Sequence, residues 1–146
     1  LSIRRQRQMC IRDSFEKLLK HFNGNISGLK ITVWGISFKP ETDDIREAPA
    51  LVIIDCIINA GGIVSVYDPV AMDECRKLKP DLNYGLDMYE ACIDSSAILL
   101  VTEWKQFRIP SWPTLKRIMK QPVLFDGRNI YDKTEMQANG FTYYSI

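Results

Sequence analysis

Short apolar segments alternate along this chain with stretches of helical spacing. The apolar segments are residues 30–36, 63–67, 97–102, 123–125 and 141–144, with a short sixth at 82–84. Because these segments are largely apolar rather than apolar at every second position, they are typical of strands buried on both faces of a parallel sheet. Helices between them would supply the crossovers that parallel strands need. The pattern therefore predicts an α/β fold, a doubly wound parallel sheet of five to six strands.

The first helix stands apart from this alternation. Residues 1–23 carry apolar side chains at the i, i+3, i+4, i+7 spacing of one helical face: Phe15, Leu18, Leu19 and Phe22. We interpret residues 1–27 as a connecting helix that precedes the sheet domain, which spans residues 28–146. Because the chain opens with Leu1 inside this helix, we expect it to be a fragment of a longer protein.

Five more helices are predicted between the strands, at residues 48–60, 70–78, 86–93, 113–119 and 133–138. Pro49 suits the first turn of its helix, since a backbone N–H at that position would have no helical partner. Asp132 and Glu135 have the spacing of a capping box for the last helix.

The composition is that of a globular domain and excludes some classes of protein. The 146 residues are 46% hydrophobic and 25% charged, and the net charge of +1 argues against a dedicated nucleic-acid binder. The longest apolar runs, such as 97–101, are too short to span a membrane. The four cysteines form no CxxC pair and His21 lies near none of them, so no metal site is expected: Cys10, Cys56, Cys75 and Cys92. With no signal peptide at the start, we expect a reduced, cytoplasmic protein.

The segments that follow the strands are the candidate site, because ligands of an open parallel sheet bind beyond the carboxyl ends of its strands. The segment after the first strand, residues 35–47, is long for such a connection, and long loops are often functional. Together these segments carry five cations and three aromatic rings: Lys39, Arg46, Lys105, Arg108, Arg128, Phe38, Trp104 and Phe107. Such a rim suits a phosphorylated ligand that contains a ring.

Some of these residues also have simpler interpretations. Trp104 and Phe107 belong to residue types that more often pack in a core than stack on a ligand. The arginines of the first helix are interpreted as a solvated face: Arg4, Arg5, Arg7 and Arg12.

Two strand ends carry further signals. The turn after the first strand has one glycine, Gly35, where a dinucleotide fingerprint needs three, so Asp68 is only a weak candidate for a ribose-binding acid. Gly127 is predicted to permit a sharp turn after residues 123–125, which would bring Arg128 over the ligand.

Four segments in order carry a resemblance to a known family. Residues 34–49 (WGISFKPETDDIREAP), 67–69 (YDP), 101–107 (VTEWKQF) and 125–132 (FDGRNIYD) resemble the C-terminal UDP-binding domain of the UDP-glucose/GDP-mannose dehydrogenase family, in its UDP-glucose branch. The match covers residues 28–146 and implies a Rossmann-like sheet. The first helix resembles the end of the central helix that joins the family's two domains.

The resemblance implies an NAD-dependent oxidation of UDP-glucose to UDP-glucuronate in two steps. Phe38, Lys39 and Arg128 match the family's residues at the nucleotide sugar, and Arg46 matches the arginine that reaches NAD. NAD itself would bind mainly to an N-terminal domain outside this chain. The family's catalytic cysteine segment has no counterpart here, so the resemblance implies no catalytic residue in this chain, which alone should be inactive. It also implies a possible homodimer through the central helix.

Two alternatives stay open. The chain could belong to a dehydrogenase of the same family that acts on another nucleotide sugar, UDP-N-acetylmannosamine or GDP-mannose. A non-catalytic flavodoxin-like module would need a phosphoacceptor Asp at the end of its third strand, and no such Asp follows Tyr84 or Thr102.

Overall fold

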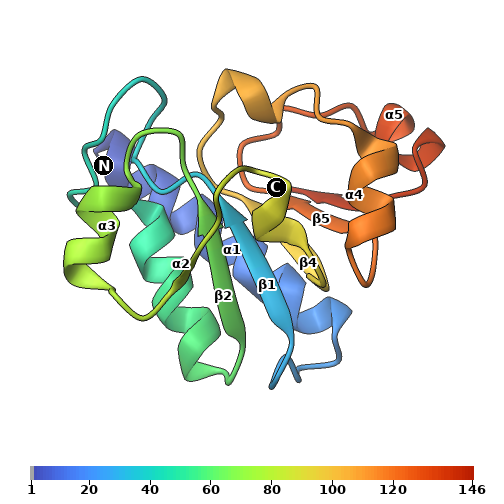
Figure 1. Cartoon of the computed structure of the whole chain (residues 1–146), viewed down its shortest axis with the longest axis horizontal. Helices are drawn as coiled ribbons and strands as arrows, with labels where there is room; N and C mark the ends of the chain where they lie inside the picture. The colour runs from blue at the N-terminus through green and yellow to red at the C-terminus, as the bar shows by residue number, and fades with distance from the viewer. Residues whose placement is uncertain (1) are drawn as a thin grey trace.

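The computed structural model describes residues 2–146, which form one parallel sheet flanked by helices (Figure 1). All six predicted strands are present and every neighbouring pair is parallel, in the order β3-β2-β1-β4-β5-β6. Their bounds are β1 Lys30–Trp34, β2 Ile63–Tyr67, β3 Asn83–Tyr84, β4 Ala97–Leu100, β5 Val123–Asp126 and β6 Thr142–Ser145. This is the strand order of a doubly wound sheet. Successive strands are added on one side of β1 up to β3 and on the other side from β4 onward, and such folds bind ligands at this switch point. The predicted fold class is confirmed.

Five of the six predicted helices form. They are α1 Ile3–His21, α2 Pro49–Asn59, α3 Met72–Leu78, α4 Trp112–Ile118 and α5 Lys133–Ala138. Pro49 occupies the first turn of α2, and the side chain of Asp132 accepts a hydrogen bond from the backbone N–H of Glu135 at the start of α5. Both sequence signals for helix starts are thereby confirmed.

The prediction of a helix at residues 86–93 is wrong, because only a 3-10 turn forms there, at Glu90–Cys92. The Asp87 carboxylate accepts hydrogen bonds from the backbone N–H groups two and three residues later. The Ala91 carbonyl accepts a hydrogen bond from Thr32 Oγ1 at 2.7 Å. Asp87 thus caps a single turn, and Thr32 Oγ1 binds a carbonyl within that turn.

Alternate residues of the central strands face two separate cores. Ile31, Val33 and Leu99 belong to the core that α1 and α2 cover, whereas Trp34 and Leu100 belong to the core that α4 and α5 cover. Because both faces of the sheet are buried, its central strands read as continuous apolar runs in the sequence.

Helix α1 packs into this domain rather than standing clear of it. Its Ile11 and Leu18 side chains are fully buried, and the helix lies against α2, β5 and β6 (Figure 1). Lys17 donates a hydrogen bond to the carbonyl of Ser145 on the edge strand β6. The helix therefore supplies part of the first core, and its further identity as the end of a connecting helix stays a prediction.

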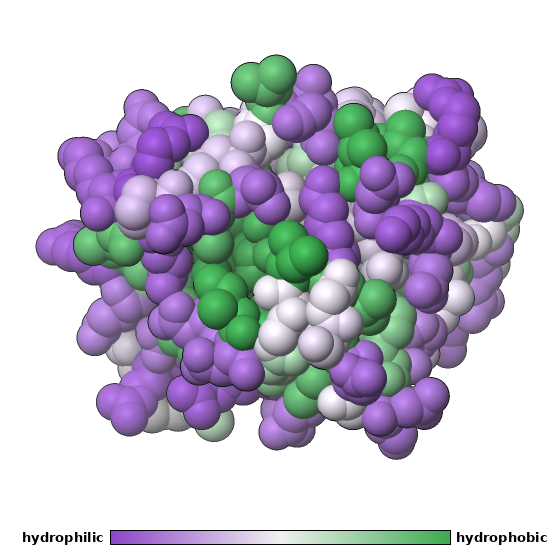
Figure 2. Space-filling model, turned by 60° about the horizontal axis from the view of Figure 1, so that its bottom comes forward, coloured by the Kyte–Doolittle hydropathy of each residue, from purple (hydrophilic) through white to green (hydrophobic). Residues whose placement is uncertain are grey.

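The amino ends of the strands lie opposite the edge that carries the candidate site residues. Three partly exposed isoleucines stand there, namely Ile58, Ile63 and Ile93. Figure 2 brings this side forward and shows an apolar area surrounded by hydrophilic residues. Within residues 2–146, no helix has the length and apolar character needed to cross a bilayer.

Candidate functional site

The carboxylate of Asp68, which directly follows β2, organises the strand ends and is fully buried. Its Oδ2 accepts hydrogen bonds from the backbone N–H groups of Ile36, at 2.7 Å, and Ser37, at 3.1 Å. Its Oδ1 accepts from the N–H groups of Val70 and Ala71, at 2.9 Å and 2.8 Å. Helix α3 starts at Met72, two residues later than the predicted start at residue 70.

The hydrogen bonds to Asp68 determine whether the turn after β1 can bind a dinucleotide. In dinucleotide-binding turns, free backbone N–H groups at this position approach the pyrophosphate. Here the N–H groups of Ile36 and Ser37 already donate to a carboxylate, and a Cβ on Gly35 would lie 2.4 Å from the Thr102 side chain. The turn therefore does not fit a primary NAD site, and Asp68 points inward rather than toward a ribose.

A second buried carboxylate, Asp126, shapes the turn after β5. Its Oδ1 accepts a hydrogen bond from the backbone N–H of Arg128 at 3.0 Å. Its Oδ2 accepts from the N–H groups of Ile130 and Tyr131, and from the hydroxyl of Tyr143 at 2.6 Å. Burial and the nearby Asp126 charge raise the pKa of Tyr131 and Tyr143, so both hydroxyls stay protonated at neutral pH. This network fixes the backbone of Arg128.

Gly127 has a different role from the one predicted. The left-handed residue of this turn is Asn129, with φ of 57°, and Gly127 itself has no positive φ. A Cβ on Gly127 would lie 2.3 Å from the Ile11 side chain and 2.7 Å from the Leu100 carbonyl oxygen. The glycine is required because α1 and β4 approach the turn too closely for any side chain.

Arg128 takes part in an ion-pair bridge that crosses the strand ends. Its Nε donates to Glu103 Oε2 at 2.9 Å, and Arg7 NH1 donates to Glu103 Oε1 at 3.2 Å. Arg7 NH1 also donates to the carbonyl of Phe38 at 2.7 Å. The bridge thus joins α1 to the loops that follow β1, β4 and β5.

Glu103 is ionised in this setting. Burial alone would raise its pKa, but a backbone N–H hydrogen bond, the Arg128 hydrogen bond and the charges of Arg128 and Arg7 outweigh burial and lower the pKa below its usual range. All three side chains are 15–20% exposed, so the bridge is partly shielded from water.

A second group of charges holds the loop after β1 against the start of α1. Asp44 pairs with Arg4 at 2.7 Å and with Arg46 at 2.9 Å. The hydrogen bonds from Arg46, and then those from Arg4, keep the pKa of Asp44 well below its usual range. The Arg4 guanidinium also lies 3.5 Å from the centre of the Phe38 ring, and Gln8 donates to the carbonyl of Glu47.

Phe38 and Lys39 line a hollow of about 480 Å³ between α1 and this loop. The other lining residues are Ser2, Ile3, Arg4, Arg7 and Glu47. Its volume lies within the range of small-molecule sites. Arg4 and Arg7 each have a carboxylate partner, but Lys39 forms no ion pair with any residue in the described part of the chain, 2–146. The hollow therefore offers an aromatic ring beside an uncommitted cation, which suits an anionic ligand.

The structure separates the residues that the sequence grouped on one rim. Phe38 and Lys39 line the same hollow, and Arg128 is linked to it through Glu103 and Arg7. Arg46 is 83% exposed and is bound to Asp44 instead. Trp104 and Phe107 are buried, and Phe107 stacks on Trp34 with ring centres 4.9 Å apart, so the core interpretation of these aromatic residues is confirmed.

Arg4 and Arg7 are the residues that the sequence analysis misjudged. They were expected on a solvated helix face, but both pair with acids that lie some 40 and 96 positions away in the chain. The available signal was the placement of Arg4, Arg7 and Gln8 on one face of the helix, with acids in the strand-end loops to receive them.

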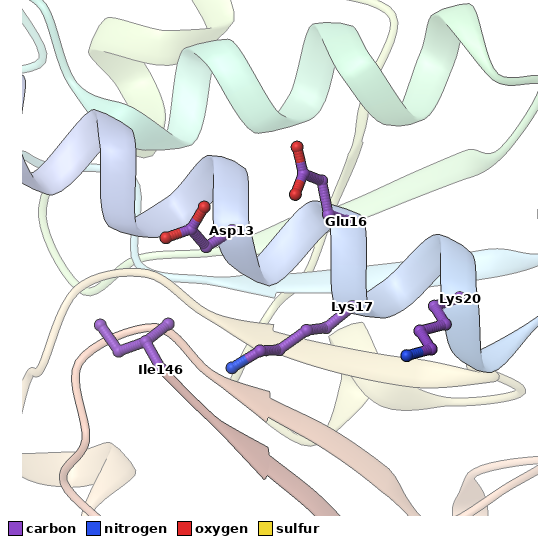
Figure 3. A pocket seen from close by; sticks show the side chains of 5 residues that line it. All are labelled: Asp13, Glu16, Lys17, Lys20 and Ile146. Carbon is purple, nitrogen blue, oxygen red and sulfur yellow. The ribbon is translucent and has the colours of Figure 1, made fainter.

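A further hollow of about 340 Å³ lies beside α1, next to the residue that follows β6 (Figure 3). Its lining residues are Asp13, Glu16, Lys17, Lys20 and Ile146. These side chains include both acids and lysines. The lining includes none of the candidate residues Phe38, Lys39, Arg46 and Arg128. It is not the candidate site.

The sequence and the fold both match known proteins. Residues 32–133 match the model of the UDP binding domain of the UDP-glucose/GDP-mannose dehydrogenase family. The chain is 43% identical to a UDP-glucose 6-dehydrogenase of Rhizobium meliloti (strain 1021) over 130 residues, which is 89% of this chain and 30% of that protein. It is 41% identical to UDP-glucose 6-dehydrogenase TuaD of Bacillus subtilis (strain 168), over 84% of this chain and 27% of that protein.

Among solved structures, a UDP-glucose dehydrogenase of Pyrobaculum islandicum matches with a TM-score of 0.76 at 25% identity, covering 94% of this chain and 29% of that one. A UDP-D-ManNAc dehydrogenase of Pyrococcus horikoshii matches with a TM-score of 0.72 at 25% identity, covering 95% of this chain and 30% of that one. The chain thus spans under a third of the length of these relatives.

Proposed function

Because this chain belongs to the UDP-glucose/GDP-mannose dehydrogenase family as its UDP-binding domain, we propose that its residues hold the UDP part of UDP-glucose in a UDP-glucose 6-dehydrogenase. In the whole enzyme, UDP-glucose would be oxidised to UDP-glucuronate in two steps. The catalytic cysteine and the main NAD site would lie in an N-terminal domain, so this chain alone would bind substrate without turning it over.

The observation that carries this proposal is the hollow between α1 and the loop after β1. It places the ring of Phe38 beside Lys39, a cation without an ion-pair partner among residues 2–146. Arg128 adds a second cation at the carboxyl ends of the strands, with its backbone held by the Asp126 network. Cations and an aromatic ring at this end of a parallel sheet suit a nucleoside diphosphate.

Arg46 is proposed to contact NAD that is bound mainly by the other domain. Its side chain is exposed and lies apart from the hollow, and Asp44 holds it by two of its nitrogens. The exposed position of the Arg46 side chain supports a contact with a ligand from outside the domain rather than a role in the UDP site. The turn after β1 offers no pyrophosphate cradle, so Arg46 would be a peripheral contact.

Calorimetric titration of the chain with UDP and with UDP-glucose tests the proposal. Saturable binding of both, with loss of affinity in Arg128→Ala, is expected. If the folded chain bound neither ligand, this domain would not carry the UDP site and the proposal would be overturned.

The sugar choice is tested by competition. The resemblance to a UDP-D-ManNAc dehydrogenase keeps a second nucleotide sugar as the alternative substrate. In the full-length enzyme, UDP-N-acetylmannosamine and GDP-mannose would compete with UDP-glucose, and preference for either would replace UDP-glucose in the proposal. The family match leaves no support for a flavodoxin-like module.

A homodimer through α1 is a further part of the proposal. Ile11 and Leu18 are used within the domain, whereas Met9 on the same helix is 53% exposed. Light scattering coupled to gel filtration would give the mass of the particle, and a monomer at high concentration would remove this part of the proposal.

A further inference from the structure

Glu103 is an acid in a place where the proposed ligand is an anion. It lies between Arg7 and Arg128, with its two oxygens 3.2 Å and 2.9 Å from their nitrogens. A carboxylate this close to a phosphate site would repel the ligand unless its charge were compensated. Arg7 supplies that compensation, since two guanidinium groups surround one carboxylate and leave a net positive charge.

The contact between Glu103 and Arg128 uses one particular atom of the arginine. Glu103 Oε2 accepts from Nε, which lies on the side of the guanidinium nearest the backbone. Within residues 2–146, no other hydrogen bond or ion pair of the Arg128 side chain is found. The two terminal nitrogens of Arg128 are therefore available as a pair, and such a pair is the edge with which arginine binds phosphate oxygens in a bidentate manner.

Arg7 fixes Glu103 from the opposite side. The same NH1 atom donates to Glu103 and to the carbonyl of Phe38, so Glu103 is tied to the backbone beside the hollow. The result is a continuous chain of polar contacts from Phe38 through Arg7 and Glu103 to Arg128.

We propose that Glu103 is a positioning residue that holds Arg128 by Nε and presents its terminal nitrogens to a phosphate group of the nucleotide sugar, with Arg7 anchoring Glu103. The inference rests on the proposed function, because it takes a nucleoside diphosphate as the ligand. Glu103 itself would not touch the ligand.

The test compares UDP affinity in the wild-type chain and in Glu103→Ala, Glu103→Gln and Asp73→Ala. Glu103→Ala frees the Arg128 side chain, which must then be immobilised on binding, so UDP affinity should fall roughly 2- to 12-fold. Glu103→Gln keeps an oxygen that can accept from Nε and should bind UDP as tightly as the wild type or more tightly. Asp73→Ala removes an exposed carboxylate of α3 and controls for the change in net charge.

The direction of the change separates the two possible roles of Glu103. A carboxylate that merely repelled the ligand would give tighter binding in Glu103→Ala, which is the opposite of the expected result. An NMR signal of the Arg128 Nε–H, protected from exchange in the wild type and in Glu103→Gln but not in Glu103→Ala, would support the positioning role directly.

The outcomes also distinguish this inference from the proposed function. If the wild type bound UDP and lost affinity in Arg128→Ala, but Glu103→Ala bound as well as the wild type, the inference alone would be overturned. Equal losses in Glu103→Ala and Glu103→Gln, together with equal drops in melting temperature, would show a structural role and would overturn it too. A folded wild type that did not bind UDP would overturn both.

Discussion

The indole Nε1 of Trp104 donates a hydrogen bond to Oδ2 of Asp68 at 3.1 Å. Asp68 follows β2 and Trp104 follows β4, and the two strands lie on either side of β1 in the sheet. The same oxygen accepts from backbone N–H groups that follow β1. One buried carboxylate therefore joins the ends of three neighbouring strands beneath the candidate site.

Asp68→Asn should lower the free energy of unfolding by at least about 2 kcal/mol. Each carboxylate oxygen accepts from at least two donors, so an amide NH2 in either orientation would face buried N–H groups and leave them unsatisfied. Urea denaturation would measure the loss. Asp132→Asn is the matched control, because Asn caps a helix about as well as Asp and should change stability by less than about 0.5 kcal/mol.

Gly127→Ala should destabilise the fold by roughly 1–3 kcal/mol through overpacking. The new Cβ would meet the Ile11 side chain and the Leu100 carbonyl oxygen. Ile11→Val removes the nearest methyl group, so the double variant should be less destabilised than the sum of the two single variants. Additive effects would show that the contact between α1 and the turn is not the cause.

Asp44→Asn should remove a pH-dependent part of the stability. In the unfolded chain an aspartate titrates near pH ~3.9, whereas hydrogen bonds from Arg46 and Arg4 lower the pKa of folded Asp44. Between these values only the unfolded state binds the proton, so this stability is present above about pH 4 and is lost as the pH falls toward the folded pKa.

Chemical denaturation over a pH series would check this prediction. The difference in unfolding free energy between the wild type and Asp44→Asn should be constant near neutral pH and should shrink below about pH 4. Asp73→Asn, on the surface of α3, controls for the loss of one carboxylate. A difference that did not change with pH would contradict the assignment to Asp44.

Arg128→Ala should weaken UDP binding roughly 10- to 150-fold. This range follows from the loss of one charged hydrogen-bond partner, about 1.5–3 kcal/mol. Calorimetry would give both affinities. Arg76→Ala on α3 is the control, because it removes an exposed guanidinium that contacts Asp73 and the Tyr84 ring, and it should bind like the wild type. Wild-type affinity in Arg128→Ala would remove this arginine from the site.

Arg46→Ala should leave UDP affinity within about twofold of the wild type, because its exposed side chain lies outside the hollow. If the full-length protein is the dehydrogenase proposed above, the same change there should raise the KM for NAD. Steady-state kinetics with each substrate varied in turn would separate the two effects. A loss of UDP affinity instead would place Arg46 in the substrate site.

The sequence by itself determined the sheet, because strands that are buried on both faces must be apolar along their whole length. It also located the loops that carry Phe38, Lys39 and Arg128, since the carboxyl ends of parallel strands meet on one side. Pro49 and Asp132 marked the starts of their helices, because each acts on backbone groups only a few residues away.

Only the tertiary structure decided which partners the charged side chains have. Arg7 meets Glu103 across 96 positions of sequence, and Thr32 donates to the Ala91 carbonyl across 59 positions. Gly127 is required by Ile11 and Leu100, which are remote in the chain, and not by the turn in which it lies. Burial patterns are repeated over many residues and can be read locally, but a single ion pair or close contact depends on how distant segments pack, which no local pattern records.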